Sequence, residues 1–190
     1  MIFETKRLLI RKAEEKDSLF FFNLWTDPEV MKFVGFPRGL NIKEEEIRKS
    51  ILKQSEGEYN KPLVIQLKDT GETIGECMLG LPDKNGISET DVKLFPIFQG
   101  KGYGKEVKKG LVDYLFTHTE CTGIKATPNQ LNMASQKMQE SVGARYAGEG
   151  SYKFPEHMRE YTVDVSFYIY ILYRKDWDSY RNQDNSNKGA

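Results

Sequence analysis

The chain has 190 residues, enough for one domain with a sizeable core, and its 28 Lys and Arg residues balance 28 Asp and Glu residues. This balance gives no electrostatic reason to expect nucleic acid or a membrane as a partner, and we expect neither. Two cysteines and two histidines supply neither a disulfide framework nor a zinc ligand set, and the N-terminus lacks the apolar stretch of a signal peptide. We therefore expect no metal and a cytoplasmic location.

Before residue 60 the sequence predicts one strand and three helices. An apolar run flanked by charge, over 7–11, predicts the strand. The helices are expected over 19–25, from Pro28 to a stop at Gly35, and up to about residue 54. Their N-caps are expected, in this order, at Asp17 or Ser18, at Asp27, and at Asn41 paired with Glu44.

The middle of the chain predicts an antiparallel meander followed by an amphipathic helix. Strands are expected over 63–67, 73–80 and 89–95, with turn residues between them. The helix is expected from about Lys105, because apolar residues recur there at every third or fourth position: Val107, Leu111, Tyr114 and Leu115. This spacing predicts that one face of the helix packs on a sheet.

A short strand and a further helix are predicted next. The strand, over 122–126, is expected to lie parallel to the strand that ends near Leu94, because the amphipathic helix connects them. The helix is expected to begin at Asn132 and to stop at Gly143, with Met138 and Val142 on one face.

The last part of the chain is rich in predicted strand. Strands are expected over 145–154 and 161–173, where aromatic and aliphatic residues gather. We expect residues 1–178 to form one domain and the polar residues 179–190 to form a disordered tail.

The glycine-rich stretch 99–105, with the sequence QGKGYGK, lies directly before the amphipathic helix. Glycines let a ligand approach the backbone, and a helix N-terminus attracts phosphate. The Walker pattern fails because Glu106 stands where a hydroxyl residue is needed, and the dinucleotide pattern fails because Lys105 occupies its third glycine position. The pattern Gln-x-x-Gly-x-Gly fits. The alternative is a glycine-rich turn whose lysines serve solubility.

This pattern, placed between a strand and a helix, resembles the acetyl-coenzyme A pyrophosphate loop of the GNAT N-acetyltransferases. Further blocks resemble the RimJ/RimL-like ribosomal-protein acetyltransferases and cover nearly the whole chain in order: 4–11, 25–31, Glu89 with Pro96 and 100–103, 132–135 with 142–144, and 164–177. That subgroup often has tryptophan at position 99 and Gly-Tyr-Trp at 91–93, where this chain has Gln99 and Asp-Val-Lys. The second departure weakens any transfer of substrate identity.

The resemblance implies a mixed α/β fold of GNAT type. The sheet would have six or seven mostly antiparallel strands, helices on both faces, and one splayed parallel strand pair near Leu94 and Ile124. It also implies acetyl-coenzyme A as acyl donor, an amine as acceptor, and no metal. Coenzyme A would be bound by a set of residues at the loop and beside it: Leu94, Gln99, Gly100, Lys101, Gly102, Tyr103, Gly104, Lys105 and Asn132.

Two residues are candidates for proton transfer. Glu89 lies at the family's glutamate position and is the expected general base, and its alternative is a solvent-exposed strand residue. Ser135 resembles the hydroxyl proposed as the acid toward the leaving thiolate, and its alternative is a serine bonding its own helix. Asp91 shares a face with Glu89 and could hold a cationic substrate, while a backbone N–H near Leu94 is expected to stabilise the oxyanion.

The sequence leaves other functions open. A non-catalytic acyl-coenzyme A-binding or sensing domain would keep the loop and lack a working acid and base. A nucleotide-phosphate binder would imitate the loop alone. For an acetyltransferase, a protein N-terminus, an antibiotic amine and a polyamine all remain possible acceptors, and the protein is expected to be a monomer or a homodimer.

Overall fold

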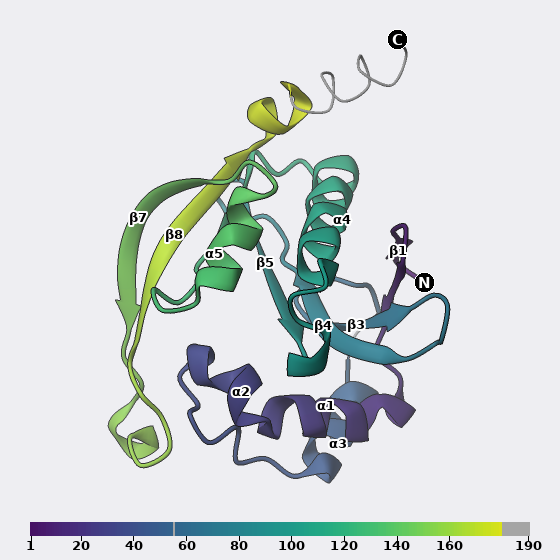
Figure 1. Ribbon diagram of the computed structural model, residues 1–190, viewed down its shortest axis with the longest axis vertical. Coiled ribbons are helices and arrows are strands. Elements are labelled where there is room, and N and C mark those ends of the chain that lie inside the picture. The colour runs from purple at the N-terminus through teal and green to yellow at the C-terminus, as the bar shows by residue number, and fades with distance from the viewer. Residues whose placement is uncertain (55, 180–190) are drawn as a thin grey trace.

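The structure, a computed structural model, describes residues 1–54 and 56–179. Within these residues the chain forms a mixed α/β fold around an eight-stranded sheet of order β1-β2-β3-β4-β5-β6-β8-β7 (Figure 1). The strands are β1 Phe3–Glu4, β2 Leu8–Lys12, β3 Pro62–Leu67, β4 Thr73–Leu79, β5 Ile87–Leu94, β6 Gly123–Ala126, β7 Arg145–Tyr152 and β8 Val165–Tyr173. The helices are α1 Ser18–Thr26, α2 Pro28–Met31, α3 Glu44–Leu52, α4 Tyr103–His118 and α5 Met133–Glu140.

The predicted fold class is confirmed, with one strand more than the six or seven expected. The extra strand is β1, which pairs with β2 through Phe3 opposite Ile10 and Glu4 opposite Leu9. Two residues are too few to display an alternating pattern, so this strand forms through its pairing with β2 and not through a local signal. Every strand pair is antiparallel except β5 with β6.

The parallel pair β5–β6 is short. It runs from Ile87 opposite Gly123 to Glu89 opposite Lys125, whereas β5 continues to Leu94 against β4 on its other side. The predicted parallel pair is therefore confirmed as a short one, and beyond it β5 continues without a described strand paired on this side. We call the region beyond the last pair, bordered on β5 by residues 90–94, the fork.

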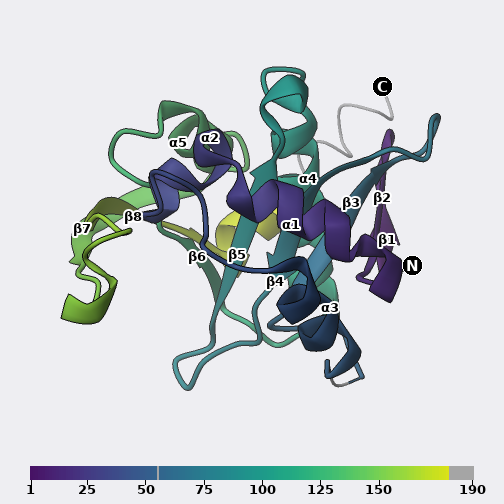
Figure 2. The ribbon, with the colours of Figure 1, turned by 90° about the horizontal axis from the view of Figure 1, so that it is seen from below.

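Helices cover both faces of the sheet, and β3 shows how the two layers are built. Leu63 and Ile65 are fully buried in the core cluster that includes the apolar face of α4. Val64, between them in the strand, packs instead with Phe21 of α1 and Ile47 of α3. Because side chains alternate along a strand, α4 lies on one face of the sheet and α1 and α3 on the other (Figure 2).

Helix α4 forms where the glycine-rich stretch ends. Gly102 is its N-cap, in a left-handed conformation with φ 83°, so the helix begins at Tyr103, two residues before the predicted start. Val107, Leu111 and Leu115 are fully buried, as their spacing predicted. Each such side chain contributes about 1.5–3 kcal/mol of burial free energy, so this stripe holds the helix on the sheet.

Asp17 stands at the predicted N-cap position of α1 but makes no side-chain capping bond, because its carboxylate accepts from the backbone N–H of Glu14 at 2.7 Å and from Arg11 at 2.7 and 2.8 Å. The predicted pair Asn41 and Glu44 is wrong, because the N-cap of α3 is Lys43, whose backbone N–H donates to the Glu46 carboxylate at 2.8 Å. Asp27 does cap α2, accepting from the N–H of Glu29 at 2.8 Å.

The end of the described chain is helical over 174–179. Apart from Ser179, the predicted tail, 179–190, lies outside the described residues. In the described part of the chain, no helix is both long and apolar enough to cross a membrane. Nor do three or more His, Cys, Asp or Glu side chains gather there in a way that could hold a metal ion.

Candidate functional site

The glycine-rich stretch presents bare backbone at the start of α4. Gly100 and Gly102 have φ angles of 75° and 83°, which side-chain-bearing L-residues rarely adopt. A Cβ built on Gly100 meets no described atom within 4 Å, and one on Gly102 meets only Arg7, 3.4 Å away. The loop is therefore open on the side where these side chains would have been.

The first turn of α4 offers unpaired donors beside this loop. The first helical bond runs from the N–H of Glu106 to the carbonyl of Gly102 at 3.1 Å. Among the described residues, no acceptor is bonded to the backbone N–H groups of Tyr103, Gly104 and Lys105. These donors and the helix dipole favour an anion, and exposed Lys101 and Lys105 add charge.

Arg7, at the start of β2, holds the loop and was missed by the sequence analysis. Its Nε donates to Glu106 at 2.6 Å, its Nη1 donates to the carbonyl of Lys101 at 3.1 Å, and its guanidinium lies 4.3 Å from the ring centre of Tyr103. Burial raises the pKa of Glu106, but bonds from Thr5 and Arg7 outweigh it and hold that pKa below its usual value. No local pattern could have predicted a contact across 99 residues.

Gln99 and Leu94 meet at the end of β5. The Gln99 amide donates to the carbonyl of Leu94 at 3.0 Å, so its side chain joins the loop to the strand instead of pointing into the loop. On its other side β5 is bonded to β4, where the N–H of Phe95 donates to Ile74 at 3.1 Å. Since backbone groups alternate along an antiparallel strand, the N–H groups of Val92 and Leu94 face the fork, and that of Val92 donates to the Asp91 carboxylate at 2.9 Å.

Asn132 and Ser135 lie at the start of α5, which packs beside α4. The N–H of Ser135 donates to the Asn132 side chain at 3.0 Å, so Asn132 is an N-cap. The Ser135 hydroxyl has no hydrogen bond to a described residue, and the side chain is half-buried. A Cβ on Gly104 would lie 3.3 Å from the sulfur of Met138, which places α5 against the first turn of α4.

Helix α5 buries a polar face that the sequence analysis did not predict. Met138 is only half-buried, although Val142 beyond the helix is buried as expected. The most buried side chains of the helix are Gln136 and Gln139. The Gln136 amide donates to backbone carbonyls of the preceding loop, so this face fixes the loop between β6 and α5.

Glu89 lies at the last β5–β6 pair on the face opposite α4. Its carboxylate is 2.5 Å from the ammonium of Lys125, its partner across the pair, and its side chain is 54% exposed. Asp91 follows on the same face and is bonded to Lys93. The structure thus brings Glu89 and Asp91 together on the α1 side and leaves Ser135 on α5.

A buried acid accompanies Asp91 on this face. Glu76 of β4 is 5% exposed, and one of its oxygens is 2.9 Å from the ammonium of Lys93. Its other oxygen has no hydrogen-bond partner among the described residues. Burial raises the pKa of Glu76, and Lys93 opposes that effect. Burial lowers the pKa of Lys93, but the negative charges of Asp91 and Glu76 outweigh burial and raise that pKa above its usual value. The sequence signal for this buried acid was a charged residue, Glu76, in the middle of an otherwise uncharged strand.

Lys108 is a second feature that the sequence analysis missed. It lies within the apolar stripe of α4, is 2% exposed, and donates to the hydroxyl of Thr90 at 2.6 Å. Thr90 is the first residue of β5 beyond the last β5–β6 pair. A lysine next to Val107 and three residues before Leu111 breaks the stripe, and that interruption could have revealed it.

The comparisons with known proteins agree on one family. The family model described as an acetyltransferase (GNAT) domain matches residues 7–145. A relative named "Uncharacterized N-acetyltransferase p20", from Bacillus licheniformis, is 28% identical over 176 residues, which cover 91% of this chain and 96% of the relative.

Solved structures share the fold. An acetyltransferase of the GNAT family from Bacillus anthracis has a TM-score of 0.74 at 24% identity and covers 92% of this chain and 99% of its own. The aminoglycoside acetyltransferase AAC(6')-Ib, solved with coenzyme A and kanamycin, has a TM-score of 0.68 at 18% identity, with 92% of this chain and 99% of its own covered.

Proposed function

The chain belongs to the GNAT acetyltransferase family, and on that premise we propose that it transfers an acetyl group from acetyl-coenzyme A to an amine. The observation that carries the proposal is the fork, which runs along β5 from Glu89 to Leu94, where Gln99 joins the strand to the open backbone at Gly100 and Gly102. A long thioester substrate needs an anion site at one end and reactive groups at the other, and the fork supplies the path between them.

The donor is proposed to bind along the fork. Its pyrophosphate would be held by the N–H groups at the start of α4, with Lys101 and Lys105 adding charge. The Cβ-free backbone at Gly100 and Gly102 fits this group, because a side chain there would occupy the space that phosphate oxygens need. Its amide-bearing arm would pair with the free edge of β5 near Leu94, and Asn132 would add a side-chain amide.

The acceptor is proposed to bind on the α1 side of β5. Glu89 and the half-exposed Asp91 supply negative charge there, which suits an amine that arrives protonated. A structural neighbour that is an aminoglycoside acetyltransferase was solved with coenzyme A and kanamycin, in keeping with an amine acceptor. Membership of the RimJ/RimL-like subgroup is part of the proposal and rests on the sequence blocks described above.

The reaction follows from these positions. Glu89 accepts a proton from the amine, directly or through water, and the freed nitrogen attacks the thioester carbon. A backbone N–H near Leu94 donates to the oxyanion. The carbon–sulfur bond then breaks, its electron pair stays on sulfur, and the hydroxyl of Ser135 donates a hydrogen bond to the leaving thiolate.

Two measurements test this function. Calorimetry compares the binding of coenzyme A with that of ATP, and thioester cleavage is followed with a peptide N-terminus, an aminoglycoside and a polyamine. We expect tight binding of coenzyme A alone and cleavage that depends on one class of amine. Binding without any amine-dependent cleavage would indicate an acyl-coenzyme A-binding domain, and equal binding of ATP would indicate a nucleotide-phosphate binder.

A further inference from the structure

Lys108 places a charged side chain in an apolar layer. It is 2% exposed and lies between α4 and the sheet, beside the fully buried Val107, Leu111 and Val112. Withdrawing an ammonium group from water is expensive, and packing alone would be served better by methionine or leucine. We therefore look for a role of Lys108 in which its nitrogen gains or loses a proton.

The contact that Lys108 makes leads to the fork. Its Nζ donates to the hydroxyl oxygen of Thr90 at 2.6 Å. A threonine hydroxyl that accepts one bond retains its own hydrogen, and no described residue accepts it. Thr90 is half-buried and borders the fork, whereas Lys108 lies behind it without access to solvent. The hydroxyl thus connects a buried nitrogen with the fork, along which the donor is proposed to bind.

The polar groups around this pair lie along β5. Ser88, on the same face of β5 as Thr90, is fully buried, and its hydroxyl has no partner among the described residues. On the opposite face of β5, Asp91 is the charge that acts on Lys108 and favours its ammonium form. Ser88 and Thr90 thus place two hydroxyls on the face of β5 that packs on α4, and of these Thr90 is the one bonded to Lys108.

The other described elements packed on α4 bring no further charged group that acts on Lys108. From β4 comes Cys77, a buried thiol whose pKa is raised by burial and which stays neutral. From α5 come the buried amides of Gln136 and Gln139, and from β1 the ring of Phe3, which packs against Gly110. The ammonium form of Lys108 is therefore held only by Thr90 and Asp91 among the groups described here.

We propose that Thr90 and Lys108 act together as the proton donor to the sulfur that leaves during acetyl transfer. The proposal rests on the function proposed above. As the carbon–sulfur bond breaks, the Thr90 hydroxyl gives its proton to sulfur, and the Lys108 ammonium gives one to the Thr90 oxygen. The products are a thiol, an intact threonine and a neutral lysine, which regains its proton through the Thr90 hydroxyl when the product leaves and solvent enters the fork. Thr90 is the catalytic residue, and Lys108 acts through it.

The acidity of the pair suits this step. Burial lowers the pKa of Lys108 to about 7, and Asp91 only partly opposes that effect. A thiol has a pKa of about 8.5, so transfer from such a lysine to a thiolate runs downhill. A serine hydroxyl can donate a hydrogen bond to the thiolate but loses its own proton far less readily, so Ser135 and this pair have different tasks.

Two substitutions test the pair in the full chain. Lys108→Met keeps the shape of the side chain and removes the buried charge, so the melting temperature should hold or rise. We expect turnover to fall on the order of 10²-fold at unchanged coenzyme A affinity. Wild-type turnover should decline above a pH of about 7, where Lys108 loses its proton, and this decline should be absent in Lys108→Met. Thr90→Val should match this loss, and Thr90→Ser should restore most of the activity.

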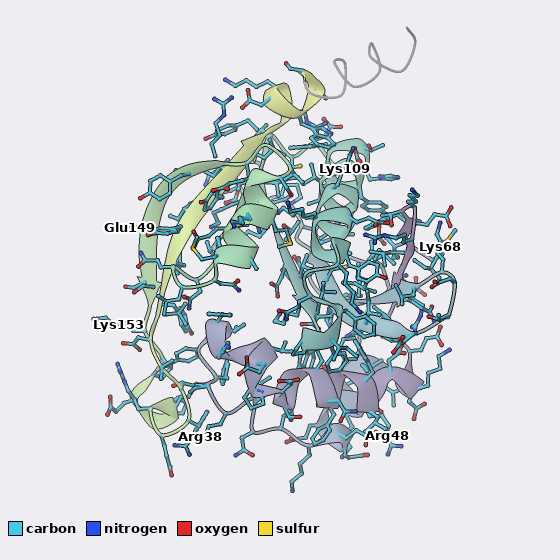
Figure 3. The ribbon with its side chains drawn as sticks, viewed as in Figure 1. Arg38, Arg48, Lys68, Lys109, Glu149 and Lys153 are labelled. Carbon is cyan, nitrogen blue, oxygen red and sulfur yellow. The ribbon has the colours of Figure 1, made fainter. Side chains whose placement is uncertain are left out.

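Lys109→Met is the matched control, because Lys109 is the next residue of α4 and is exposed (Figure 3). It should leave turnover and its pH profile unchanged. Wild-type turnover with unchanged pH profiles in both Lys108→Met and Thr90→Val would overturn the proposal. So would a Lys108→Met variant that loses activity only in proportion to lost folding or lost coenzyme A binding.

A binding measurement separates this inference from the proposed function. The ultraviolet absorbance of the thiolate reports the pKa of the thiol of bound coenzyme A. Below a pH of about 7, where Lys108 carries its proton, its ammonium should favour the thiolate, so the thiolate fraction should be larger in the wild-type complex than in the Lys108→Met complex. Equal thiolate fractions at that pH would refute the inference even if no acceptor were found. If coenzyme A did not bind at all, the proposed function and this inference would both fail.

Discussion

Glu89 and Lys125 form the last residue pair between β5 and β6, and their side chains are ion-paired at 2.5 Å. The carboxylate proposed as the base is therefore fixed at the point where the two strands separate. It stays 54% exposed, so it can reach an incoming amine as well as the lysine. A cross-strand ion pair of this kind contributes little to stability, roughly 0–1 kcal/mol, which leaves Glu89 available for chemistry.

We predict that Glu89→Gln lowers turnover near neutral pH by about 10²–10⁴-fold, because the amine is then protonated and has no base to accept its proton. Turnover should recover in part as the pH approaches the pKa of the amine, near ~10 for a lysine-like group. Steady-state rates across pH check this. Glu72→Gln, in an exposed turn, is the control. Wild-type rates at every pH would remove Glu89 from the reaction.

We predict that Gly102→Ala weakens coenzyme A binding at least tenfold, because its Cβ would occupy open backbone beside the unpaired N–H groups of α4. The variant also pays about 1–2 kcal/mol for its left-handed backbone. Gly71→Ala is the matched control, with φ 72° in a turn and only the Gln66 side chain within 4 Å. Calorimetry on both variants should show equal loss of stability and unequal loss of affinity. Equal affinities would place the pyrophosphate elsewhere.

Much of the fold could be predicted because its signals are local. The apolar spacing of α4, the turns of the meander and the cap at Asp27 each depend on a few neighbouring residues, and each was confirmed. Strand β1 was missed because its two residues carry no pattern. Asp17 stands at the N-cap of α1 as predicted but makes no capping bond, because Arg11, on a neighbouring strand, binds the same carboxylate.

The candidate site was predicted in part for the same reason. The loop 99–105 has a sequence pattern, whereas the contacts that hold it come from distant segments. Arg7 binds Glu106 across 99 residues and Lys108 binds Thr90 across 18. Gln99 carries a family signal, yet its amide bonds the end of β5 instead of facing the loop. The sequence pattern predicted the candidate site, and tertiary packing decides which contacts each side chain makes there.

We predict that Asp17→Asn lowers the free energy of unfolding by about 3 kcal/mol near neutral pH, because it leaves the buried Arg11 guanidinium without its counter-charge. Burial raises the pKa of Asp17, but bonds from Arg11 and Glu14 outweigh it, so the folded-state pKa lies below the usual value. The contribution of this carboxylate is thus complete above the unfolded-state pKa, about 3.9, and is lost as pH falls below it.

Chemical denaturation of wild type and Asp17→Asn checks this prediction. The two stabilities should differ most near neutral pH and converge in acid, since protonated Asp17 and asparagine are then alike. Glu15→Gln, at an exposed neighbouring position, should follow wild type throughout. A difference that stayed constant with pH would show that the ion pair is not its source.

Ser135→Ala should lower turnover by roughly tenfold, less than Glu89→Gln, because the hydroxyl donates a hydrogen bond worth about 1.5 kcal/mol to a thiolate. The defect should shrink as pH rises past the thiol pKa of about 8.5, where sulfur leaves more easily unaided. The fold should persist, since the backbone N–H that Asn132 caps remains in alanine. Ser141→Ala is the control, because that hydroxyl bonds the Met138 carbonyl near the other end of α5. Turnover rates and coenzyme A affinities of both variants distinguish a catalytic role of Ser135 from a binding role. A loss as large as that of Glu89→Gln would make Ser135 the principal acid and Thr90 secondary, whereas a fall in affinity with unchanged turnover would make it a binding residue.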